Sequence, residues 1–173
     1  MYGYQLRVEF EASTGSTWPL NIGQVYTTLS RMERDGLVEL DAATGEGDGK
    51  VTYRITQEGR GELGRWFDTP LERQSRPRDE LAIKLAMALV TPGVDVRRVV
   101  QNQRTATLRT LRELTRLKAR ADADADAAWL LVNESMIFQA EAEARWLDHC
   151  EAQLTGNGRL RPITARTPTE VAP

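Results

Sequence analysis

Hydrophobic residues at helical spacing divide this sequence into a mixed region and a helical region. In the mixed region, residues 21 to about 35 place Ile22, Val25, Leu29 and Met32 on one stripe, as in a helix that buries one side. A shorter helix over residues 3 to about 12 precedes it. Two strands are predicted over residues 37–40 and 51–56, because apolar and polar residues alternate along the second. A third helix follows, which gives the order helix, helix, hairpin, helix.

Residues at the ends of these elements support the same assignment. Asn21 is a favoured residue at the start of a helix, and Gly36 supplies the left-handed residue that often ends one. Thr56 is placed to cap the third helix. The second helix is therefore predicted to run from Asn21 to about Asp35.

Residues from about 78 to 155 have a helical pattern almost throughout. Helices are predicted from 78 to 90, from a cap at Asp95 to about 121, and from about 127 to 154. The last helix carries apolar residues on more than one side, including Phe138 and Trp146. Such excess apolar surface favours a homodimer formed through these C-terminal helices. An antiparallel hairpin that uses the same surface within one chain is the alternative.

Prolines and glycines set the expected boundaries. Pro70 and Pro77 bracket a linker over residues 71–78, so we expect a first domain over 1–70 and a helical dimerisation domain over 79–155. Residues 156–173 have no periodicity and are expected to form a disordered tail. The predicted fold class is therefore mainly α with a small β-hairpin wing, a winged helix-turn-helix followed by a helical dimerisation domain.

The polar side of the helix that starts at Asn21 gives the first indication of a function. Gln24, Thr27, Thr28 and Arg31 lie opposite the apolar stripe, where an exposed helix usually carries Glu and Lys. Amide, hydroxyl and guanidinium groups donate hydrogen bonds to phosphates and base edges, and a helix start offers free N–H groups to a phosphate. This favours a helix that enters the major groove of DNA. The alternative is a solvated helix face that binds nothing.

The hairpin and the charge of the chain refine this hypothesis. Lys50 and Arg54 lie on the hairpin, which would rest on the DNA backbone beside the helix. The chain has 23 Lys and Arg against 25 Asp and Glu, and residues 1–70 hold 7 against 11. This excludes a protein that coats nucleic acid by positive charge alone, but not one that reads a duplex with a local surface. The rival hypothesis, slightly favoured by the acidic balance, is a protein–protein adaptor that uses a degenerate winged helix without DNA.

Four separate sequence blocks occur in order within the first 67 residues. They are Gly3–Leu6, Trp18–Leu29, Arg31–Val38 and Tyr53–Gly59. In this order and spacing they resemble the PadR family of transcriptional regulators. The resemblance implies a dimeric winged-helix repressor that binds double-stranded operator DNA and is often released by a small aromatic or drug-like ligand. It also implies that the helix from Asn21 is the recognition helix, with Tyr26, Thr27 and Thr28 in its DNA-facing block.

The resemblance also implies a further N-terminal helix, whose leucines complete the winged-helix core. The sequence begins at the Gly3 block, where that helix would already have ended. Either the start codon was assigned too far downstream, which we favour, or the chain lacks part of this core. Each large apolar side chain left without its cover forgoes roughly 1.5–3 kcal/mol.

Four tryptophans in a chain with only 6% aromatic residues suggest a ligand pocket. Trp129, Met136 and Trp146 would line a cavity between the long helices and the first domain, and would stack on a flat apolar effector. The alternative is that each is an ordinary anchor of the core or of an interface.

Other functional chemistry is sparse in this sequence. A single histidine, His149, and a single cysteine, Cys150, provide no metal site, no disulfide framework and no converging nucleophile–base pair. We therefore expect no catalytic residues, no cofactor and no enzymatic activity. Neither a secretion signal nor a membrane span is apparent, so we expect a cytoplasmic protein that has no membrane partner.

Overall fold

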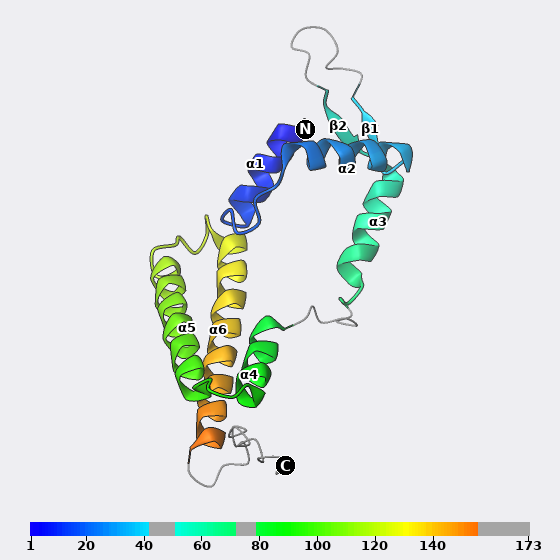
Figure 1. Cartoon of the computed structure of the whole chain (residues 1–173). Coiled ribbons are helices and arrows are strands. Elements are labelled where there is room, and N and C mark those ends of the chain that lie inside the picture. Colours follow the sequence, from blue (N-terminus) through cyan, green and yellow to red (C-terminus); the bar gives the residue numbers. More distant parts are fainter. Residues whose placement is uncertain (42–50, 72–78, 156–173) are drawn as a thin grey trace, which may run out of the picture. The chain divides into compact units, whose positions relative to one another are not determined.

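The structure, a computed structural model, describes residues 1–41, 51–71 and 79–155 (Figure 1). The chain divides into two compact units. The first contains Met1–Arg73 and Asp124–Trp129, and the second contains Gln74–Ala123 and Leu130–Pro173. The linker predicted over 71–78, apart from Leu71, and the tail predicted over 156–173 lie outside the described residues.

The first unit has the predicted order helix, helix, hairpin, helix. Its elements are α1 (Gly3–Ser13), α2 (Ile22–Arg34), β1 (Val38–Leu40), β2 (Tyr53–Ile55) and α3 (Gln57–Asp68). The three predicted end signals are confirmed. The Asn21 side chain caps α2 by accepting a hydrogen bond from the N–H of Gly23 at 2.8 Å, and Gly36 follows α2 with a φ of 74°. Thr56 caps α3, since its hydroxyl oxygen accepts from the N–H of Gly59 at 3.0 Å.

The hairpin is shorter than predicted, with three residues in each strand. β1 and β2 are antiparallel, with Val38 opposite Ile55 and Leu40 opposite Tyr53. The predicted alternation holds inside β2, because Tyr53 and Ile55 are half-buried and Arg54 is exposed. Val51, the first residue of the predicted strand, lies before the observed one and is 49% exposed. The backbone of Met1 pairs with Tyr53 in both directions, at 2.8 and 2.9 Å, and ties the start of the chain to the hairpin.

The second unit contains α4 (Glu80–Val90), α5 (Val96–Lys118) and α6 (Ala127–Leu154) from Leu130 onward. Figure 1 shows α5 and α6 side by side. They run antiparallel, since Arg104 near the start of α5 pairs with Asp148 near the end of α6, and Lys118 pairs with Glu134 at 2.6 Å. The side chain of Asp95 caps α5 as predicted. The helix ends at Lys118, three residues before the predicted end.

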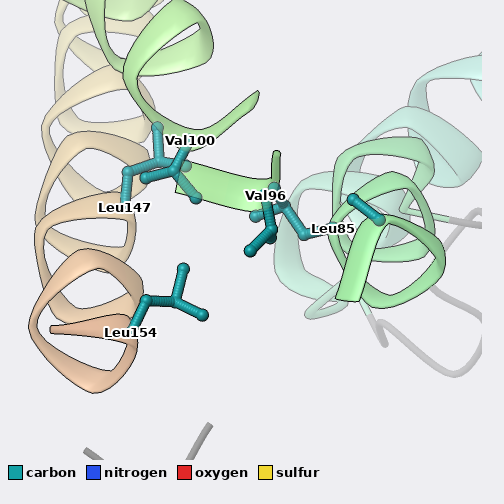
Figure 2. Packing of buried hydrophobic residues seen from close by; sticks show 6 residues of the cluster. Leu85, Val96, Val100, Leu147 and Leu154 are labelled. Carbon is teal, nitrogen blue, oxygen red and sulfur yellow. The ribbon is translucent and has the colours of Figure 1, made fainter. Parts of the chain in front are cut away.

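The core of the second unit lies where α4 meets the start of α5 and the end of α6 (Figure 2). Its buried members are Leu85 and Ala88 from α4, Val96 and Val100 from α5, and Leu147 and Leu154 from α6. α4 begins at Glu80 because Asp79 caps it, accepting from the N–H of Ala82 at 3.0 Å. Among the described residues, no helix is both long enough and apolar enough to cross a membrane.

Candidate nucleic-acid interface

α2 has the two-sided character that the sequence predicts. Leu29 is buried, and the other members of the apolar stripe, Ile22, Val25 and Met32, are half-buried. On the opposite side, four polar residues are exposed, namely Gln24, Thr27, Thr28 and Arg31. The helix therefore holds its place through one side and presents a polar side to solvent. We call these four residues the polar face of α2.

Most of the polar face makes no hydrogen bond or ion pair through its side chains within the described residues. The hydroxyl of Thr27 donates to the carbonyl oxygen of Gly23 at 2.9 Å. Gln24, Thr28 and Arg31 have neither a hydrogen bond through their side chains nor an ion pair in the parts of the chain that the structure describes. An amide, a hydroxyl and a guanidinium thus remain free to bind an external partner.

The start of α2 adds a site for an anion. Asn21 uses its side-chain oxygen to cap the helix, which leaves its amide nitrogen as a donor. The first turn contains no acidic residue, so nothing there neutralises the positive end of the helix dipole. Free N–H groups at such an end bind phosphate well.

Tyr26 lies on a different side of α2 from the polar face. Its ring covers the buried Gly3 of α1, where a Cβ atom would lie only 2.8 Å from Cε1 of Tyr26. Tyr26 is nevertheless 42% exposed. The structure therefore does not bring Tyr26 together with Thr27 and Thr28, although the resemblance placed the three in one block.

Arg54 is the described basic residue of the hairpin. It lies on the exposed side of β2, and its guanidinium donates to the carboxylate of Asp41 at 2.8 Å. That hydrogen bond, together with the negative charge of Asp41, raises the pKa of Arg54 above its ordinary value. The guanidinium of Arg54 is therefore positioned by Asp41 and stays charged. Lys50, the other basic residue predicted for the hairpin, lies outside the described residues.

A hollow of about 990 Å³ joins α2 to the hairpin. It is lined by all four residues of the polar face and by Arg54, so helix and hairpin contribute to one concave surface. Its apolar lining includes Val25, Leu29 and Met32 from α2 and Val38 and Ile55 from the hairpin. Sequence periodicity gave no sign of this hollow, because it depends on how far α2 stands from the strands.

The residues predicted to bind an effector lie in different surroundings. Met136 lines a separate hollow between α5 and α6. Trp146 packs against the core of the second unit, and Trp129 belongs to the first unit. In residues 1–41, 51–71 and 79–155, no group of three His, Cys, Asp or Glu side chains is placed to hold a metal ion.

Comparison with known proteins agrees with this fold. Residues 1–65 match the family model of the transcriptional regulator PadR-like family, and residues 77–155 match the model described as virulence activator alpha C-term. The first unit is therefore similar to the PadR-like transcriptional regulators. The two matches follow each other along the chain, one in each unit.

Solved structures share the fold of this protein over most of its length. The Vibrio cholerae virulence activator AphA is 26% identical, with a TM-score of 0.59 over 87% of this chain and 88% of that one. Bacillus subtilis PadR in complex with p-coumaric acid is 19% identical, with a TM-score of 0.65 over 88% and 89%. Among curated proteins, the probable transcriptional regulator Rv1176c of Mycobacterium tuberculosis is 37% identical over 70 residues. That match covers 40% of this chain and 37% of the relative, so it spans well under half of the relative's length.

Proposed function

We propose that this protein binds operator DNA specifically and acts as a dimeric repressor. α2 would enter the major groove with its polar face, and the hairpin would lie on the neighbouring backbone. The observation that carries the proposal is that Gln24, Thr28 and Arg31 are exposed and free on one side of a helix whose other side is packed. The likeness to a structure titled Bacillus subtilis PadR in complex with operator DNA supports it at the level of the fold.

Each polar group has a distinct role in this proposal. The guanidinium of Arg31 suits the two acceptors of a guanine edge, and the amide of Gln24 suits the donor and acceptor of an adenine edge. The hydroxyl of Thr28 serves either base. The start of α2, with Asn21, would bind a phosphate and set the register, as would Arg54 and Lys50 from the hairpin. Tyr26, by its position over Gly3, would contribute at the edge of the contact.

The second unit would supply the dimer and the response to an effector. Ile83, Met87 and Val90 form an exposed apolar stripe on α4 that a second copy would cover. Two copies would bind two half-sites, as dimeric helix-turn-helix proteins do. Bacillus subtilis PadR is solved with p-coumaric acid, which supports a small aromatic effector that releases DNA. We further propose that the protein acts in the cytoplasm and has no catalytic activity.

A gel-shift titration with the intergenic DNA beside its own gene tests the proposal. Arg31→Ala should weaken specific binding by about tenfold or more at constant salt, because one bidentate base contact contributes ~1–3 kcal/mol. The matched control is Arg65→Ala, which removes the same charge from α3, where Arg65 pairs with Glu62. Arg65→Ala should bind as the parent does.

Two results would contradict the proposed function. If Arg31→Ala and its control bind equally well, the polar face of α2 does not read DNA. If the parent gives neither retardation nor a dependence on salt, the protein is better described as a protein–protein adaptor.

A further inference from the structure

A hollow of about 340 Å³ lies between α5 and α6, away from the core that α4 covers. Its apolar lining comes from Ala106 and Leu114 on α5 and from Met136 and Ala140 on α6. This volume is at the lower end of the range found for small-molecule sites, which is about 300–1,000 Å³. The methionine is a flexible side chain that adapts to the shape of a bound group.

Glu143 is the charged residue of this hollow. It is half-buried, and its Oε1 atom accepts two hydrogen bonds, from Nε2 of Gln103 at 3.0 Å and from the hydroxyl of the buried Thr107. Both donors are neutral. Within the described residues of α5 and α6, Glu143 has no ion pair. A carboxylate that is partly removed from water thus lacks a positive partner, which is unfavourable unless a ligand supplies one.

Two other carboxylates of α6 do form ion pairs with basic residues of α5. On one side of the hollow along α6, Asp148 pairs with Arg104. On the other side, Glu134 pairs with Lys118 at 2.6 Å. Glu143 lies between these two acidic residues on α6, but its partners on α5, Gln103 and Thr107, carry no charge.

We propose that this hollow binds an organic cation that has a small apolar body. The cationic group would lie against the carboxylate of Glu143, held in place by Gln103 and Thr107. The apolar body would pack between Leu114, Met136 and Ala140, in the space that the structure leaves open. Because Glu143 is half-buried, its attraction for a cation is screened less than at a fully exposed position. An anionic ligand would be repelled by the same carboxylate, so the ligand proposed for this hollow differs in charge from the p-coumaric acid solved with Bacillus subtilis PadR.

This assignment gives the effector of the proposed function a chemical class, and it rests on that function for its regulatory meaning. The binding itself requires no DNA and is tested without it. No organic cation of the proposed class is added in the Arg31→Ala gel-shift. Either proposal can therefore fail while the other stands.

Isothermal titration calorimetry of the full chain with benzyltrimethylammonium tests the site, with benzyl alcohol as the neutral comparison. The parent should bind the cation in preference to the alcohol. Glu143→Gln keeps the shape and the acceptor oxygen but removes the charge, so it should weaken binding by at least about tenfold. Glu141→Gln is the matched control, because Glu141 lies on α6 two residues earlier and does not line the hollow. It should bind as the parent does.

A second variant tests binding at the same hollow if Glu143→Gln is unstable. Ala106 lines the hollow from an exposed position, so Ala106→Leu should fill the space and abolish binding without affecting the helical content. Unchanged affinity in both variants would place the cation elsewhere and overturn the proposal. Failure of the parent to bind the cation would also overturn the proposal. In that case, a change in the dimer dissociation constant of Glu143→Gln would show that a second copy fills the hollow.

Discussion

Gly59 is the residue at which a single added carbon atom should damage the first unit most. It is buried in the first turn of α3, where a Cβ atom would lie 2.0 Å from the carbonyl oxygen of Leu37 and 2.9 Å from Cγ1 of Ile55. The Leu37 oxygen is itself held in place, since it accepts from the N–H of Thr56 at 3.1 Å and from its hydroxyl at 3.2 Å. Neither side of the contact can move without breaking these hydrogen bonds.

The cost of Gly59→Ala can be worked out from this contact. Ordinary contacts of a Cβ atom begin at 3.4 Å, so α3 and the Leu37 backbone would have to separate by about 1.4 Å. Alanine in a helix gains up to ~1 kcal/mol over glycine. Overpacking of this kind costs about 1–3 kcal/mol, and loss of the Thr56 cap costs about 1 kcal/mol more. We therefore expect a net loss of about 2 kcal/mol in the free energy of unfolding.

Gly64→Ala is the matched control, because Gly64 lies on the same helix and a Cβ atom there would have no neighbour within 4 Å. This variant should gain up to ~1 kcal/mol from helix propensity alone. Urea unfolding of the full chain, followed by circular dichroism, measures both changes. Hydrogen exchange of residues 51–71 then shows whether the loss lies in α3 and the hairpin. If Gly59→Ala is as stable as Gly64→Ala, the close contact with Leu37 does not exist and this account of how α3 packs is wrong.

Two further predictions concern the second unit. Asn133 is 2% exposed, and its Nδ2 atom donates to the Leu114 carbonyl at 3.1 Å. Its Oδ1 atom has no hydrogen-bond partner among the described residues. Because a buried acceptor without a partner is unfavourable, Asn133→Leu should raise the free energy of unfolding by about 1 kcal/mol. A clear fall in the thermal unfolding midpoint of Asn133→Leu would contradict this. Met87 is 56% exposed on the apolar stripe of α4, so Met87→Glu should shift the proposed dimer toward monomer in sedimentation velocity. Lys84→Glu changes an exposed polar position of the same helix and should leave the dimer unchanged. Equal dimerisation of the two variants would remove this stripe from the interface.

Local sequence signals predicted much of the first unit correctly. The caps at Asn21 and Thr56 and the end of α2 before Gly36 involve atoms only a few residues apart, so residue type alone is informative. The polar face of α2 also follows from periodicity, because Gln24 and Arg31 are seven residues apart and return to the same side of a helix. The predicted exposure of these residues is confirmed.

Predictions that needed contacts between elements could not be made in the same way. Nothing in the sequence near Gly59 shows that the Leu37 carbonyl lies against it, since that contact depends on how α3 leaves the hairpin. The resemblance grouped Tyr26 with Thr27 and Thr28, but one residue along a helix turns the side chain by about 100°, which directs Tyr26 toward Gly3. Tryptophan content likewise cannot distinguish a pocket from a core, and Trp146 packs against the core.

Internal ion pairs neutralise four of the acidic side chains of the first unit. Four of its arginines are paired within the unit, namely Arg7 with Glu11, Arg34 with Asp35, Arg54 with Asp41 and Arg65 with Glu62. In residues 1–41 and 51–71 this leaves Arg31 and Arg60 as the arginines without an ion pair. Each pair cancels an acidic charge that would otherwise repel phosphate, and only Arg54 among the paired arginines lines the concave surface. Recognition of DNA by this protein would then depend less on net charge than on the neutral donors of α2. Arg31 is the positively charged residue among them that would contact a base edge and so distinguish sequences.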